Sequence, residues 1–189
     1  MAEPEIRWYG HDSFVLTDGQ IRVAIDPWQL PPDVPPVDII CVTHEHQDHC
    51  SADDVRRISG PNTVVIAAAS CGTVLSEFSP KLVTPGTSLT FGSVTIETVP
   101  AYNIDKFRSP GVPFHPPAYG HVGYIVTIAG KRIYHPGDTD RIPEMKQIRA
   151  DIALLPVSGT YVMTAEEAAG AASDIHPHMV IPMHYGRII

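Results

Sequence analysis

Short runs of apolar and β-branched residues, bounded by Gly, Pro and Asp, fill the first third of the chain. Such runs predict β-strands, which we place at 6–9, 13–17, 21–25, 37–42 and 63–67. Ser51, with the Asp54 carboxylate three positions on, is typical of a helix start and predicts a short helix to Ile58. Ser70 predicts a second helix to Phe78. Short helices are therefore expected between strands of a sheet.

The second half of the chain repeats this arrangement. Strands are expected at 82–83, 88–91, 93–99, 122–128 and 132–135, with Ala129-Gly130 as a hairpin turn. The apolar run 151–155 predicts a buried strand, Thr164 and Glu167 predict a capping box that opens a helix to about Ser173, and 179–183 predicts a last strand. This order favours an α/β fold in which two mixed sheets pack face to face with helices outside, forming one domain over 1–189.

Composition narrows the class of protein. The chain has 189 residues, 13 Lys plus Arg against 21 Asp plus Glu and a net charge of −8, which disfavours disorder and a nucleic-acid partner. The longest apolar run, 64–69, falls far short of the roughly 20 residues that cross a bilayer, and the acidic start does not resemble a secretory signal. Cys41, Cys50 and Cys71 cannot all pair within the chain, which fits a reducing compartment. We expect a cytoplasmic protein without a membrane partner; no pattern points to a particular oligomeric state.

The strongest chemical signal is the run His44-Glu45-His46-Gln47-Asp48-His49, which lies between a predicted strand and a predicted helix. Two imidazoles two residues apart on an extended loop can bind one metal ion, and the carboxylate and imidazole just beyond can bind a second. The H-E-x-x-H motif is not matched, because Asp48 stands four positions after His44. A mixed nitrogen and oxygen set suits borderline divalent metals.

This H-x-H-x-D-H spacing and its placement resemble the metallo-β-lactamase superfamily. The resemblance runs through Gly10-His11-Asp12-Ser13-Phe14, Ile25-Asp26-Pro27-Trp28, Val99-Pro100-Ala101-Tyr102-Asn103, Tyr134-His135-Pro136-Gly137-Asp138-Thr139-Asp140, Leu155-Pro156-Val157-Ser158-Gly159-Thr160-Tyr161 and Met183-His184-Tyr185. Within the superfamily, the chain is similar to small cytosolic metal-dependent hydrolases related to the ascorbate phosphate lactonases. The resemblance implies a four-layer αβ/βα sandwich with a dinuclear metal site at one edge of the two sheets.

The resemblance also implies a ligand set. His44 and His46 match the histidines of the first metal, and Asp48 and His49 match ligands of the second. Asp138 matches the bridging carboxylate, and His184 matches the last ligand of the second metal. Asn103 stands where the family has its third first-metal histidine. Either the first site is depleted, or His115 or His121 of the proline-rich loop replaces that histidine. We favour His115, because His121 abuts the strand that begins at Val122.

The expected activity follows from such a pair of ions. Divalent ions held about 3.5 to 4 Å apart can share a bridging hydroxide and polarise a substrate oxygen. We expect a hydrolase that uses a metal-bridging hydroxide on a small-molecule substrate, an anionic ester, lactone or phosphodiester, with Asp48 and Asp138 as catalytic carboxylates. Zinc is the expected metal, with manganese, iron or nickel as alternatives. The alternative from another class is a non-catalytic metal-binding or ligand-sensing module whose first site is degraded at Asn103.

Several further residues have two interpretations. Lys106 and Arg108, in the proline-rich loop, either clamp an anionic substrate or simply belong to an exposed loop, and Tyr161 either contacts substrate or packs. His11 and His135 either orient ligands or are buried structural residues, so we keep both outside the metal set.

Two other sets are expected to lie away from the site. His176 and His178 should lie roughly 20 Å from His184 along an extended strand, on the surface. Cys50, although it follows His49, is expected in the core rather than on a metal.

Overall fold

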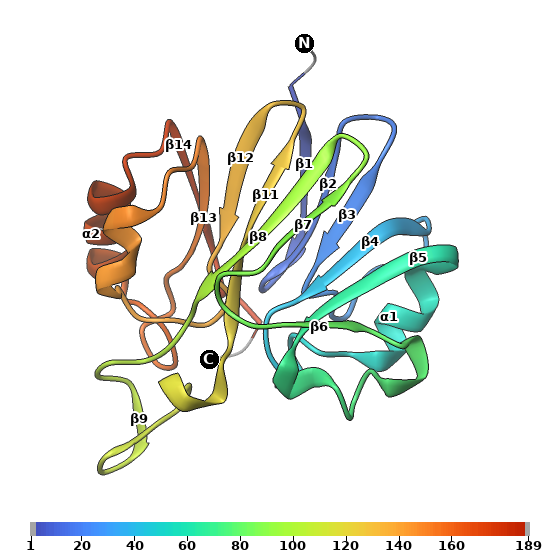
Figure 1. Ribbon diagram of the computed structural model, residues 1–189. Helices are drawn as coiled ribbons and strands as arrows, with labels where there is room; N and C mark the ends of the chain where they lie inside the picture. The colour runs from blue at the N-terminus through green and yellow to red at the C-terminus, as the bar shows by residue number, and fades with distance from the viewer. Residues whose placement is uncertain (1–2, 188–189) are drawn as a thin grey trace.

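A computed structural model of the chain describes residues 3–187, and its two large sheets stand face to face with the α-helices on their outer sides (Figure 1). The first sheet has six strands in the order β1-β2-β3-β4-β5-β6. Their bounds are Glu5–Gly10, Ser13–Thr17, Arg22–Ile25, Val37–Val42, Ser59–Ala68 and Lys81–Val83. Pairing is antiparallel from β1 to β3 and parallel from β3 to β6, so the sheet is mixed.

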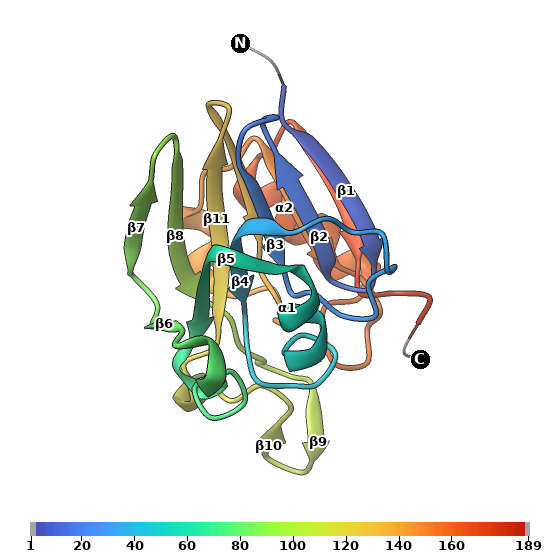
Figure 2. The ribbon, with the colours of Figure 1, turned by 90° about the vertical axis from the view of Figure 1, so that its right-hand side faces the viewer.

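The second sheet mirrors this plan with the strand order β14-β13-β12-β11-β8-β7. The strands, in chain order, are β7 Ser88–Phe91, β8 Val94–Pro100, β11 Val122–Ile128, β12 Lys131–His135, β13 Ile152–Pro156 and β14 Met179–Met183. Its antiparallel pairs lie on the β7 side and its parallel pairs on the β14 side. In the chain between β8 and β11, β9 Phe107–Ser109 and β10 Val112–Pro113 form a small hairpin. This hairpin extends away from the sheets in both views (Figures 1 and 2).

Each α-helix covers one sheet. The helix α1, Ala52–Ile58, is capped by the Ser51 side chain, which accepts a hydrogen bond from the Asp54 N–H, and it buries Val55 and Ile58. The helix α2, Ala165–Ile175, begins with a complete capping box between Thr164 and Glu167. It packs with the 3₁₀ turn Pro143–Gln147 against the outer face of the second sheet. These helices give the sandwich its two outer layers.

The main core lies between the sheets and draws side chains from both, such as Phe14 and Ile40 from the first and Val126 and Leu154 from the second. Tyr124 is fully buried there, and its hydroxyl donates a 2.9 Å hydrogen bond to the Val42 carbonyl of the opposite sheet. That bond satisfies a polar group which would otherwise destabilise the core. It also ties β11 to the end of β4, directly before the histidine-rich loop.

The predicted strands agree with the structure, and the bounds of β2, β4, β11 and β14 match the predicted ones. The helix predicted at 70–78 is wrong: the segment forms 3₁₀ turns at Ala69–Cys71 and Ser76–Phe78. Gly72, Thr73 and Val74 have low helix propensity, which explains why this segment does not form a regular helix. The proline-rich segment that was expected to be a loop, with Pro100, Pro110, Pro113, Pro116 and Pro117, contains the β9–β10 hairpin.

Over residues 3–187, no helix has the length and apolar character that a membrane span requires. Cys41, Cys50 and Cys71 are all buried and free, as expected for core residues.

The capping box of α2 supports a prediction about stability. Replacing Thr164 by alanine removes the oxygen that accepts the Glu167 N–H, and we expect the free energy of unfolding to fall by about 1 kcal/mol. Urea unfolding measures this change through the midpoint at constant slope. Thr164→Ser keeps the oxygen and is the matched control; an equal loss in both variants would show that the cap does not carry the effect.

Candidate metal centre

The candidate site lies where strand ends from both sheets meet. The loop His44–His49 follows β4, Asp138 follows β12, and His184 follows β14. His11 lies in the turn between β1 and β2. The His44–His49 loop, Asp138 and His184 lie just past the carboxyl ends of β4, β12 and β14. The two halves of the chain therefore supply the site together.

A first cluster contains three imidazoles, His44, His46 and His115, each of which offers a nitrogen within 4.8 Å of the others. His46 Nδ1 lies 3.1 Å from His44 Nε2 and 3.2 Å from His115 Nε2. Three converging neutral imidazole nitrogens can hold a divalent ion. His115 comes from the loop after β10 and lies where a third ligand of the first metal would have to be.

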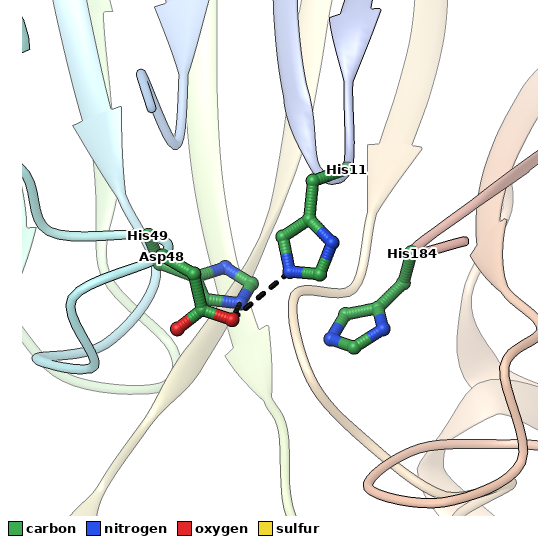
Figure 3. Close-up of side chains that lie close together, drawn as sticks. All are labelled: His11, Asp48, His49 and His184. Atoms are coloured by element: carbon green, nitrogen blue, oxygen red, sulfur yellow. Dashed lines mark hydrogen bonds and ion pairs between the residues drawn. The ribbon is translucent and has the colours of Figure 1, made fainter. Parts of the chain in front are cut away.

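A second cluster contains His11, Asp48, His49 and His184, whose side chains point toward one another (Figure 3). His11 Nε2 is 3.0 Å from Asp48 Oδ2, and His49 Nε2 is 3.7 Å from the same oxygen. His11 is fully buried, with its ring centroid 4.0 Å from that of His184. Sequence reasoning kept His11 outside the ligand set; the structure places it against Asp48, as a donor that can orient this carboxylate or as a further ligand.

Asp138 lies between the two clusters. Its Oδ2 is 3.3 Å from His115 Nε2 and 3.2 Å from His184 Nε2, and its Oδ1 is 3.3 Å from His49 Nε2. Gly137 permits this placement, because it has φ +64° and a Cβ there would lie 2.8 Å from the Thr43 side chain. The carboxylate is therefore directed at both clusters at once.

Asp26, at the end of β3, orients two histidines of the loop after β4. Its carboxylate accepts from the Thr43 N–H at 2.8 Å, from the Thr43 hydroxyl at 2.6 Å and from His49 Nδ1 at 2.8 Å. Because the Thr43 hydroxyl donates its proton to Asp26, the Thr43 hydroxyl oxygen accepts a hydrogen bond from His44 Nδ1 at 2.9 Å. The His44 ring thus carries its proton on Nδ1 and presents an unprotonated Nε2 to the site. The His49 ring also donates through Nδ1. Burial acts against its charged form, but the Asp138 and Asp26 carboxylates outweigh burial and raise its pKa well above the ordinary value, so a metal ion would have to displace the Nε2 proton.

Asn103 fixes the third ring of the first cluster in the same manner. Its Oδ1 accepts from the His115 N–H at 2.8 Å and from His115 Nδ1 at 2.9 Å. Its Nδ2 donates to Asp140 Oδ1 and to the Tyr161 carbonyl, at 3.1 and 3.0 Å, which determines the orientation of the amide. The residue that replaces the family's histidine therefore leaves His115 Nε2 free to face His46 and Asp138.

The other histidines have different surroundings. His121 Nε2 lies 2.9 Å from Glu45 Oε2, an ion-pair distance, and does not belong to the first cluster. His135 Nε2 donates to the Asp12 carbonyl and its Nδ1 accepts from the Gly137 N–H, so its ring is structural. His176 and His178 are exposed, as the sequence predicted.

Lys106 and Arg108 do not line the site. The Lys106 ammonium lies 3.0 Å from the Glu167 carboxylate and 3.7 Å from that of Asp140. Arg108 donates to the Phe114 carbonyl at 3.0 Å. Both cations are thus engaged with protein oxygens, and the substrate clamp considered from the sequence has no support in this geometry.

Burial and the carboxylates set the protonation of the rings in opposite directions. Burial lowers the pKa of His44 well below its ordinary value and lowers the pKa of His115 to about 4. For His184, burial also acts against the charged form, but the Asp138 and Asp12 carboxylates outweigh it and raise its pKa to about 9. His44 and His115 are therefore neutral, the form in which imidazole binds metals.

Buried polar atoms without a hydrogen bond indicate what the site can accept. Among the described residues, His49 Nε2 and Asp138 Oδ1 have no hydrogen-bond partner although both are buried, and the same is true of both Asp12 oxygens. Burial raises the pKa of Asp12 to about 8. Such orphaned donors and acceptors lower stability unless a ligand satisfies them, and a divalent cation would satisfy His49 Nε2 and Asp138 Oδ1.

Comparison with known proteins gives consistent matches over nearly the whole chain. The family model described as Beta-lactamase superfamily domain matches residues 5–184. A UPF0173 metal-dependent hydrolase of Symbiobacterium thermophilum is 32% identical over 199 residues, covering 96% of this chain and 84% of the relative.

Solved structures agree with these sequence matches. A crystal structure from Parabacteroides distasonis, assigned as a metal-dependent hydrolase, superposes with a TM-score of 0.87 at 35% identity, over 98% of this chain and 84% of that one. Igni18, a metallo hydrolase of Ignicoccus hospitalis, gives a TM-score of 0.77 at 25% identity, with the same coverage of 98% and 84%.

The role of Asn103 can be measured directly. In Asn103→Ala the Nδ1–H and backbone N–H of His115 lose their acceptor, so we expect a mixture of ring tautomers and an affinity for one of the bound divalent ions that is about 10- to 100-fold weaker. Ring ¹⁵N chemical shifts report the tautomer, and titration calorimetry with Zn²⁺ reports the affinity. The matched control is Asn62→Ala at an exposed position. Unchanged shifts and affinity in Asn103→Ala would contradict the assigned role.

Proposed function

The chain belongs to the metallo-β-lactamase superfamily and is a metal-dependent hydrolase, and we propose that it uses a pair of divalent ions to hydrolyse a small ester, lactone or phosphodiester. The observation that carries the proposal is the position of Asp138 between the two clusters. Its Oδ2 lies near His115 of the first cluster and His184 of the second, and its Oδ1 lies near His49 of the second. We further propose that residues 1–189 act as one domain, since the main core combines side chains from both sheets.

The ligand assignment we propose follows the two clusters. One ion would be held by His44, His46 and His115. The other would be held by Asp48, His49 and His184. Asp138 would serve both ions. Hydrogen bonds from Nδ1 of His44, His49 and His115 to oxygens outside the clusters support this assignment, because ligand histidines usually donate to such a partner. His184 Nδ1 has one too, 3.0 Å away at Ser158 Oγ.

When bound, the two ions would supply a water-derived nucleophile near neutral pH and polarise the carbonyl or phosphoryl oxygen of the substrate. The chain's own residues would position the reactants. Asp48, partly exposed to the cavity, is held by His11 through one oxygen and can accept a hydrogen bond from attacking water through the other. Gly137 permits the placement of Asp138 between the two clusters. Both carboxylates are therefore our candidates for catalytic residues.

The donor set bears on the metal and on substrate charge. Nitrogen-rich ligands with carboxylates suit zinc, which we propose first, with manganese, iron and nickel as alternatives. The substrate clamp that was one of two interpretations of Lys106 and Arg108 has no support, because their charged groups contact protein oxygens. A negative charge on the reacting group would therefore be met by the ions, and the cavity offers no second cationic contact from these two residues.

Metal content tests this proposal. Protein purified without chelator or metal-affinity column should contain about two equivalents of metal per chain by elemental analysis. His46→Ala and Asp138→Ala each remove a proposed ligand, so we expect loss of metal together with loss of any ester, lactone or phosphodiester hydrolysis. His178→Ala, with a side chain that is 84% exposed, is the matched histidine control and should keep both.

Two outcomes would overturn the proposal. Hydrolysis retained by chelator-treated protein would exclude the metal-dependent mechanism. One equivalent or less in the presence of excess metal would favour the non-catalytic binding module suggested by Asn103.

A further inference from the structure

A small cavity opens directly onto the proposed metal centre. Its volume is about 240 Å³, below the range of roughly 300 to 1,000 Å³ usual for drug-sized ligands. Five of its lining residues belong to the proposed ligand set, and the remaining two are Phe114 and Tyr161. These two aromatic rings are therefore the part of the wall that would contact whatever flanks the reacting group of a substrate.

The two rings are held in a defined arrangement. Their centroids lie 4.8 Å apart at an interplanar angle of 82°, an edge-to-face geometry. Phe114 follows β10 directly, its N–H donates to the Lys106 carbonyl, and its own carbonyl accepts from Arg108. The Tyr161 carbonyl accepts from Asn103, the residue that also orients His115. The backbone of Tyr161 and the ring of His115 are thus held by the same amide.

The charged side chains that line the cavity lie on its metal-cluster side, where the reacting group of a substrate would bind. Over residues 3–187, no lysine or arginine lines this cavity. Its only charged lining side chains apart from histidine are Asp48 and Asp138, which face the metal clusters. The Arg108 guanidinium lies 5.9 Å from the Phe114 ring centroid, but it donates to the Phe114 carbonyl and does not line the cavity. An anionic group placed away from the ions would thus meet aromatic rings rather than a cation inside the cavity, which is unfavourable.

We propose that Phe114 and Tyr161 form an apolar subsite that accepts an uncharged aryl or compact alkyl substituent next to the scissile bond of an ester or lactone. The inference rests on the proposed hydrolase function and specifies its substrate class. For a lactone, water adds to the acyl carbon, the ring C–O bond breaks, the ring oxygen takes up a proton as a hydroxyl, and the carboxylic acid product releases one proton at neutral pH.

A pair of lactones that differ in one substituent tests the subsite. The zinc-loaded protein is assayed with γ-phenyl-γ-butyrolactone and with the analogue that carries a carboxylate in place of the phenyl ring, by proton release into a pH indicator. We expect kcat/KM to be at least about tenfold higher for the phenyl lactone, because a hydrophobic pocket discriminates by roughly this factor or more. Phe114→Ala should reduce that ratio about tenfold, and Phe114→Leu should reduce it less.

The control lies on the same hairpin. Phe107 is 46% exposed and does not line the cavity, so Phe107→Ala should leave the ratio unchanged. Metal content and circular dichroism of each variant show whether a loss reflects misfolding. A ratio near one in the wild type, or an unchanged ratio in well-folded Phe114→Ala, would overturn the apolar subsite while the hydrolase function stands.

A binding measurement separates this inference from the proposed function. If neither lactone is hydrolysed by fully loaded protein, lactone hydrolysis is overturned. The subsite is then decided by titrating phenylacetate and malonate separately and following the Phe114 and Tyr161 ring signals by NMR. Preferential binding of phenylacetate, weakened in Phe114→Ala, supports the subsite; equal or tighter binding of malonate overturns it.

Discussion

The buried carboxylate of Asp26 is the constraint on which the candidate site depends. A carboxylate with no exposure to solvent is strongly unfavourable unless its oxygens are satisfied, and Asp26 accepts three hydrogen bonds, two from Thr43 and one from His49. The Thr43 hydroxyl oxygen, whose proton is donated to Asp26, in turn accepts a hydrogen bond from His44 Nδ1. One acidic side chain just after β3 therefore makes Nδ1 of two candidate ligands a donor, directly for His49 and through Thr43 for His44.

The two halves of the chain contribute unequal but complementary parts. The first half brings three histidines and Asp48 on one loop, whereas the second half brings His115 from the loop after β10 and Asp138 and His184 from separate strand ends. Neither set forms a site alone, because Asp138 contacts rings from both. Packing of the sheets, which Tyr124 reinforces by bonding across to Val42, is thus a condition for metal binding, and metal binding in turn should stabilise the packed sheets.

Local patterns were sufficient to predict most of the fold. Apolar periodicity located β4 and β14 to the residue, and the capping box located the start of α2, because these signals depend on neighbours in the sequence. The 70–78 segment failed because three weak helix formers lie in its middle. The sequence also identified the candidate metal-binding loop, but it did not reveal that Asp26 orients it, since that contact joins residues 23 positions apart in the sequence.

Asn103 shows why a missing family residue is weak evidence for lost function. From the sequence, its place in the pattern suggests a degraded site; in the structure the amide makes four hydrogen bonds, two of which hold His115. The same loop is bound further along, where the backbone N–H groups of residues 104 and 105 donate to Asp140. A loop tied down at so many points does not resemble a free lid. It presents Phe114 beside the candidate ligands in a fixed position, so substrate contacts there would be preorganised rather than formed on closure.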